Sequence, residues 1–175
     1  MPNWCKNNLR IKDNGEKTLE LLEYVKDEEG SFTMNKAVPM PKELEDTESP
    51  NYDDAEKKKK LVEKYGADNW YDWHCNNWGC KWDASESGFW KDGDDWMISF
   101  QTPWGPPTEF MKNISKQFPK MKFILQFADE GRGSYPLGQC TYINGEEVFR
   151  MPEDSDEAGT FANSVWDEEW VNGYD

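Results

Sequence analysis

The order in which strand-like and helix-like patterns follow one another constrains the fold of this chain more than any other feature of its sequence. Residues 4–12 alternate apolar and polar side chains, which predicts a strand, and residues 16–27 carry an apolar stripe at helical spacing, which predicts a helix. Residues 32–38 predict a second strand, which Pro39 and Pro41 then end. The first part of the chain is therefore expected to be strand, helix, strand.

The same kinds of pattern return further along the chain. Residues 95–102 (DWMISFQT) alternate in the clearest strand pattern, residues 108–118 show helical spacing behind a capping threonine, and residues 122–128 predict another strand. Residues 141–150 fold back around an Asn-Gly pair, which is typical of a hairpin turn. This part is therefore expected to be strand, helix, strand and hairpin.

With residues 42–90 set aside, the combined order is typical of a ferredoxin-like sandwich, an α+β fold in which two helices cover one face of an antiparallel sheet. We therefore predict one ferredoxin-like domain over residues 1–150, with a Trp-rich insertion at about 42–90 and an extra C-terminal hairpin. Residues 151–175 are predicted to be an acidic C-terminal segment, which is either helical around 161–166 or loose.

The formal net charge of −15 narrows the classes of partner. Residues 151–175 contain eight Asp and Glu residues and neither Lys nor Arg, so the negative charge is densest there. Such a field repels DNA, RNA and anionic lipid, and it suits a basic partner or simply solubility. Direct binding to nucleic acid or to a membrane is therefore not expected.

The sequence also carries expectations about the compartment. No stretch approaches the roughly 20 apolar residues of a membrane-spanning helix, and the first residues lack the apolar core and cleavage site of a signal peptide. A cytoplasmic protein is therefore expected. In that compartment the four cysteines are expected to be thiols rather than disulfides. They are Cys5, Cys75, Cys80 and Cys140.

A metal site and a catalytic site are both disfavoured by spacing. His74, Cys75 and Cys80 lie close in the sequence, but zinc sites are typically built from paired Cys knuckles, and no second knuckle follows. The single histidine is adjacent to Cys75, which usually points the two side chains apart, so a Cys–His dyad is not expected. No phosphate-binding glycine loop is present. We therefore predict neither metal nor cofactor, and a protein that is not an enzyme.

Tryptophan gives the candidate site. Seven of the ten tryptophans lie within residues 67–104, in segments rich in Asn, Gly and Pro. Aromatic side chains there either form a structural mini-core that pins the insertion to the sheet, or present a platform that stacks on a ligand. Lys81 and Arg132 could add cations for an anionic ligand. The candidate binding residues are Trp70, Trp73, Trp78, Lys81, Trp82, Trp104 and Arg132.

Short motifs in a fixed order give a family resemblance. They are MPNWC at the amino terminus, VPMP at 38–41, NWYDW at 69–73 with NWG and KWD close behind, and FQTPWGPP at 100–107. Over residues 1–150 the chain resembles the YubB-type ferredoxin-like family of bacteriophage and plasmid proteins. The resemblance implies a ferredoxin-like fold without an iron–sulfur cluster, an origin in a phage or mobile element, and a place in the cytoplasm of the bacterial host cell. It implies no defined activity.

Three functions remain open at this point. The first is a binding protein of a phage or mobile element that antagonises a host defence system by binding a host protein. The second is a protein that sequesters a small nucleotide signal between tryptophans, with Trp78 and Trp104 as its test positions. The third is an acidic mimic of nucleic acid, with carboxylates of the C-terminal segment in place of phosphates.

Overall fold

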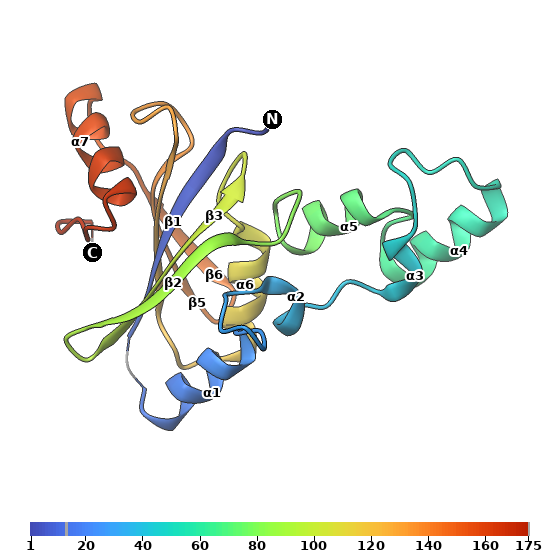
Figure 1. Ribbon diagram of the computed structural model, residues 1–175, viewed down its shortest axis with the longest axis horizontal. Helices are drawn as coiled ribbons and strands as arrows, with labels where there is room; N and C mark the ends of the chain where they lie inside the picture. The colour runs from blue at the N-terminus through green and yellow to red at the C-terminus, as the bar shows by residue number, and fades with distance from the viewer. Residues whose placement is uncertain (13, 175) are drawn as a thin grey trace.

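A six-stranded antiparallel sheet forms the centre of the computed structural model, which describes residues 1–12 and 14–174 (Figure 1). Asp175, at the end of the acidic segment, lies outside the described residues. The strands are β1 (Trp4–Ile11), β2 (Ser85–Asp92), β3 (Asp95–Pro103), β4 (Phe123–Asp129), β5 (Leu137–Ile143) and β6 (Glu146–Arg150). They lie in the order β2-β3-β1-β4-β5-β6.

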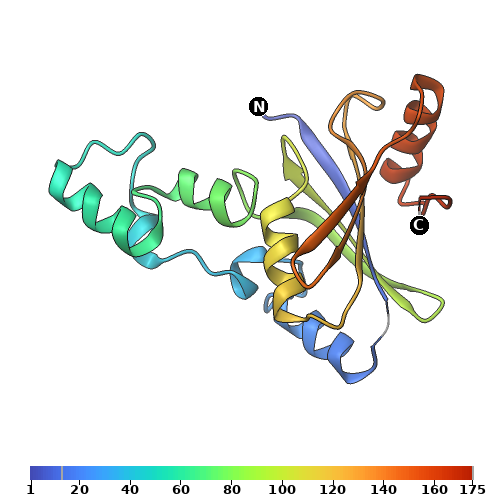
Figure 2. The same cartoon turned by 180° about the vertical axis from the view of Figure 1, so that it is seen from behind.

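Helices pack against both faces of this sheet, and one group of them projects to the side. The helices are α1 (Glu16–Tyr24), α2 (Met34–Ala37), α3 (Lys42–Glu45), α4 (Ala55–Tyr65), α5 (Trp70–Asn77), α6 (Thr108–Gln117) and α7 (Ser155–Trp166). Helices α1 and α6 lie on one face, which we call the first face, and α7 lies on the other, the second face (Figures 1 and 2). Within the described part of the chain, no helix has the length and apolar character needed to cross a membrane.

The predicted ferredoxin-like fold is confirmed. Strands β1, β2, β3 and β4 with helices α1 and α6 follow the strand-helix-strand order twice, and the hairpin of β5 and β6 extends the sheet beyond β4. On the first face, Leu9 pairs with Ile98 on one side and with Leu125 on the other. Helices α1 and α6 cover this row with buried apolar side chains, among them Leu21, Leu22, Phe110, Met111 and Ile114.

The strand predicted over 32–38 is wrong. Phe32 makes only an isolated bridge with Lys26, and helix α2 follows at once, with Thr33 as its N-cap. The apolar pattern reports burial instead, because the ring of Phe32 stacks on that of Phe100 with 4.4 Å between centroids. The true second strand is β2, which begins inside the range 42–90 that was set aside as an insertion and runs two residues beyond it. Its polar sequence, SESGFWKD, belongs to an edge strand with few buried side chains.

Helices α3, α4 and α5 with their loops (residues 42–79) form a helical lobe that projects from the sheet (Figures 1 and 2). Buried residues of the lobe, Leu44, Leu61 and Trp73, belong to the same apolar cluster as the first face. In the lobe, the polar helix α4 is capped at both ends: its N-cap Asp54 accepts a hydrogen bond from the Lys57 amide, and it ends at Gly66 in the left-handed conformation.

Candidate binding site

The loop after β3 carries a tryptophan in an unusual backbone conformation. Trp104 has a φ of 68°, in the left-handed region, and its side chain is 49% exposed. For a bulky residue this conformation costs about 1–2 kcal/mol, because Cβ approaches the following carbonyl oxygen. Two hydrogen bonds hold it: the Trp104 amide donates to the Asn3 carbonyl at 2.8 Å, and the Thr102 hydroxyl donates to the Gly105 carbonyl at 2.7 Å.

The buried side chain of Asn7 holds this loop through Thr102. Asn7 lies within the sheet and its side-chain amide donates to the Thr102 hydroxyl at 2.8 Å and to the Cys5 carbonyl at 3.0 Å. Asn7 and Thr102 are both fully buried. The Thr102 hydroxyl therefore accepts from Asn7 and donates to Gly105, which fixes its orientation and, through it, the loop.

Three tryptophans and one lysine meet beside this loop. The Lys81 ammonium lies 4.4 Å from the ring centroid of Trp82 and 5.3 Å from that of Trp104, and the ring of Trp82 lies 6.4 Å from that of Trp4. Trp82 is 38% exposed. We call Trp4, Lys81, Trp82 and Trp104 the aromatic platform. Its residues come from the start of β1, from the segment before β2 and from the end of β3.

His74 of the lobe, Cys80 and the N-terminal end of α2 fix the Lys81–Asp83 segment. His74 Nδ1 donates to the Lys81 carbonyl at 2.7 Å, and the Cys80 thiol donates to the Trp82 carbonyl at 3.3 Å. The Asp83 carboxylate accepts the Thr33 hydroxyl at 2.7 Å and a backbone amide of α2 at 2.8 Å. The platform is therefore held in place by its backbone, which leaves the rings of Trp82 and Trp104 open to a partner.

The other candidate residues lie elsewhere. Trp73 and Trp78 are buried, and Trp78 donates its indole N–H to the Val38 carbonyl at 2.9 Å while its ring stacks on His74. In this conformation they act as the mini-core that joins the lobe to the sheet. Trp70 is half-buried on α5. Arg132 lies on the β4–β5 loop against α7, where it donates to the Asn163 side chain at 3.1 Å.

The structure thus brings Lys81, Trp82 and Trp104 together and separates them from Trp73, Trp78 and Arg132. Trp4 completes the platform and was absent from the candidate residues, although it lies in the MPNWC motif. The signal that would have found it is its place at the end of a strand, since its pairing opposite Pro103 sets it beside the Trp104 loop. Pairing across a sheet is not visible in one strand alone.

Burial sets the protonation of the cysteines and of His74. Burial raises the pKa of all four cysteine thiols, which keeps them protonated at neutral pH, and burial lowers the pKa of His74. Because His74 Nδ1 donates to a carbonyl, the neutral ring leaves Nε2 as an acceptor; this atom is buried and has no partner in the described structure. Across the described residues no group of three or more His, Cys, Asp or Glu side chains could hold a metal ion.

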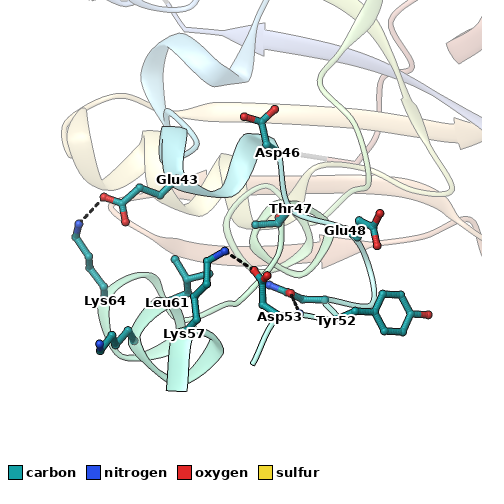
Figure 3. Close-up of a pocket in the computed structure, with 11 residues that line it drawn as sticks. Glu43, Asp46, Thr47, Glu48, Tyr52, Asp53, Lys57, Leu61 and Lys64 are labelled. Atoms are coloured by element: carbon teal, nitrogen blue, oxygen red, sulfur yellow. Dashed lines mark hydrogen bonds and ion pairs between the residues drawn. The ribbon is translucent and has the colours of Figure 1, made fainter. Parts of the chain in front are cut away.

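A pocket of about 680 Å³ lies in the helical lobe, between α3, α4 and the loop that joins them (Figure 3). Three lysines of α4 line it, and each forms an ion pair: Lys57 with Asp53, Lys60 with Glu56 and Lys64 with Glu43. These side chains are mostly exposed, and exposed pairs contribute little. Because the cations are already paired at the surface, they do not converge on the space of the pocket.

Comparisons with known proteins agree with this fold. A family model described as the ferredoxin-like domain in Api92-like protein matches residues 77–169. The crystal structure of the api92 protein from Yersinia pseudotuberculosis superposes with a TM-score of 0.54 at 10% sequence identity, over 88% of this chain and 100% of that one. At this identity the likeness concerns the fold alone. A search of curated protein sequences found no match.

Proposed function

The chain belongs to the family of ferredoxin-like domains in Api92-like proteins, and from this premise we propose that it is a non-enzymatic protein that binds a partner protein through the aromatic platform. One observation carries the proposal. Trp104 is half exposed and held at positive φ, a conformation that costs about 1–2 kcal/mol, and its ring is not part of the buried core. Backbone strain of this kind collects at binding sites, where the surrounding structure holds it.

The chemistry of the platform suits a protein partner. Tryptophan is the residue most enriched at the energetic centres of protein interfaces, because a single indole buries a large apolar area and keeps one polar group. Trp82 and Trp104 present two such rings beside one cation. With a net charge of −15, a partner with a basic rim around an apolar pocket would gain in association rate.

The same geometry favours a protein over a small nucleotide. A nucleotide would need two indoles with open space between them, whereas the Lys81 ammonium lies against both Trp82 and Trp104. Trp78, which the nucleotide hypothesis requires at the surface, is buried. For the biological setting we propose what the YubB-type resemblance implies, namely a protein of a phage or mobile element whose partner is a bacterial host protein of a defence system.

Affinity capture with matched variants tests the proposal. Tagged wild-type protein is expected to recover a bacterial protein at low salt, with recovery that weakens as salt rises because screened charges steer association less. Trp82→Ala and Trp104→Ala are each expected to lower recovery about ten-fold or more, as for central interface residues. Tyr52→Ala is the control, because Tyr52 is an aromatic residue of the helical lobe that is more exposed than either tryptophan (Figure 3).

Equal recovery with all variants, or none with the wild type, would remove the platform as a binding site. The nucleotide alternative is tested on the same samples by measuring the thermal unfolding temperature in the presence of each nucleotide of a panel. A ligand bound at a hundred times its dissociation constant would stabilise the protein by about 2.7 kcal/mol. A clear rise with one nucleotide, lost in Trp104→Ala, would replace the protein partner by a nucleotide.

A further inference from the structure

A row of four polar side chains crosses the second face of the sheet. In register, Ser99 of β3 pairs with Asn8 of β1, Asn8 with Gln126 of β4, and Gln126 with Gln139 of β5. All four residues are buried, each with no more than 2% of its surface exposed. Buried polar groups cost free energy unless they are hydrogen-bonded, so this polar row has to bind something.

The polar row binds the main chain of the C-terminal segment. Gln126 donates to the Val171 carbonyl at 2.7 Å and accepts from the Val171 amide at 3.0 Å, so one side chain pairs with both backbone groups of a residue. Asn8 donates to the Val165 carbonyl at 2.8 Å, and Gln139 donates to the Tyr174 carbonyl at 2.8 Å. Contacts of this kind recognise a peptide backbone whatever its side chains are.

Cations beside the row recognise a carboxylate and an aromatic ring. Lys6, almost fully buried, lies 2.6 Å from a Glu168 oxygen that also accepts the Ser99 hydroxyl at 3.0 Å. The Arg10 guanidinium lies 4.6 Å from the ring centroid of Trp170. Lys6 and Arg10 share the second face of β1; Arg10 is also paired with Asp92 and Asp95, so Lys6 is the cation that a carboxylate meets there.

The C-terminal segment does not complete this arrangement. Asn8 Oδ1 is buried under α7 and has no hydrogen-bond partner among the described residues, although the other end of the same side chain is bonded. Glu168, which supplies the carboxylate, sits at a φ of 59°, in the left-handed region. Because α7 covers Asn8, the strained backbone of Glu168 is the feature that a competing peptide can improve, by presenting its carboxylate from an unstrained residue.

Apolar contact holds α7 more firmly than the residues after it. Phe161, Ala162 and Val165 are buried against Ala128 and Leu137 of the sheet. Beyond α7, Val171 and Tyr174 are only partly buried. Tyr174 packs its ring on Phe161 and donates its hydroxyl to Glu157, and further contacts of this segment are the hydrogen bonds and the ion pair described above. Segments with few buried apolar contacts open at lower free energy than the core, so residues 167–174 can leave the sheet while the domain stays folded.

We propose that the second face of the sheet is a binding site for an extended acidic peptide of a partner protein, and that residues 167–174 occupy it in the free protein as an intramolecular pseudo-ligand. The preferred peptide carries a carboxylate for Lys6 and Ser99, then an aromatic residue for Arg10, and presents its backbone to Gln126 and Gln139. Such a peptide competes with the chain's own segment. This site lies on the face of the sheet, apart from the aromatic platform, and stands independently of it.

The proposal is tested by measuring peptide binding to a full-length variant in which residues 167–174 are released from the sheet. The probe is a labelled peptide with the sequence of residues 164–174, followed by fluorescence anisotropy. Glu168→Lys removes the carboxylate from Lys6 and places a like charge beside it, so this variant is expected to bind the peptide about ten-fold or more tightly than the wild type does. Glu169→Lys, the same charge change one residue further on, is the control and should bind as the wild type does. Adding Gln126→Ala to Glu168→Lys should abolish the gain.

No binding by Glu168→Lys, or equal binding by Glu169→Lys and by the double variant, would overturn the proposal. Amide hydrogen exchange on the wild-type chain gives a second test that needs no variant. The Val171 amide is expected to exchange roughly 100-fold or more faster than the amides of β1 and β4, because the segment opens without the sheet. If Val171 is protected as strongly as those strands, the segment is a fixed part of the fold and the proposal fails.

Discussion

The two faces of the sheet differ in the contacts that cover them, because the second face adds a row of polar side chains to the apolar packing of α7. On the first face, α1 and α6 pack apolar side chains on the row of Leu9, Ile98 and Leu125. On the second face, α7 and the residues after it lie over a row of amides and hydroxyls and over Lys6. Apolar burial is strong and non-directional, whereas a hydrogen bond adds little net stability but requires a particular geometry. The first face therefore holds the fold together, and the second face selects what lies on it.

The largest expected effect tests the first face. Phe100 is fully buried and stacks on Phe32, so Phe100→Ala removes a large apolar contact and leaves a cavity. We expect the free energy of unfolding to fall by about 3–5 kcal/mol, measured by urea denaturation. Val148→Ala on the exposed strand β6 is the control and should change it by less than about 0.5 kcal/mol. A loss below about 1 kcal/mol for Phe100→Ala would mean that the first face is not the main source of stability.

A smaller effect is expected on the second face. Gln126→Ala leaves the Val171 amide and carbonyl without their side-chain partner, and we expect a loss of about 1–3 kcal/mol in urea denaturation. Hydrogen exchange should rise mainly in residues 167–174, with β1 and β4 almost unchanged. Gln101→Ala is the matched control. Gln101 of β3 also lies on the second face, opposite Lys6, but none of the described hydrogen bonds joins it to residues 167–174. A loss as large as that of Phe100→Ala would erase the difference between the faces.

The two faces also differed in how well the sequence predicted them. The first face was predicted, because strand alternation at 95–102 and helical spacing at 108–118 both report apolar burial directly. Strand β2 was missed because an edge strand has little burial to report. The polar row could not be predicted, since Asn8, Gln126 and Gln139 look like solvent-facing residues until the register aligns them under α7. Trp82 and Trp104 were among the candidate residues because they lie in the Trp-rich segment. Trp4 was missed because only the strand register places it beside them.

Acid is expected to act on the two sides of the sheet at different pH. Burial lowers the pKa of His74, which lies in the lobe on the side of the first face, below its ordinary 6.5. The unfolded chain therefore binds the proton first, so this contribution to stability is complete above pH 6.5 and declines as pH falls through the lowered pKa. On the second face the hydrogen bond from Lys6 lowers the pKa of Glu168 below 4.5, so that contribution is complete above pH 4.5 and is lost only at lower pH.

Thermal unfolding between pH 7.5 and 5 checks the first of these effects. The wild type should lose stability over this range, while His74→Phe, which keeps a flat ring against Trp78, should lose less. The protection factors of the amides in residues 167–174, taken relative to unprotected amides at the same pH, should stay unchanged until the pH falls below 4.5. If protection in this segment already falls near pH 6, then the two sides respond together and the pH comparison fails.

The smallest expected effect concerns the aromatic platform, which lies at the strand ends and belongs to neither face. Trp104→Gly relieves the positive φ, worth about 1–2 kcal/mol, but removes a cation–π contact with Lys81 worth about 0.5–1 kcal/mol, so the net change in stability should be close to zero. Trp104→Ala loses the same contact while its Cβ retains the strain. We therefore expect the free energy of unfolding of the glycine variant, measured by urea denaturation, to be about 1 kcal/mol higher than that of the alanine variant. Both variants should be equally impaired in partner capture. If the alanine and glycine variants had the same free energy of unfolding, the positive φ of Trp104 would carry no strain. The aromatic platform would then lose the observation that marks it as a binding site.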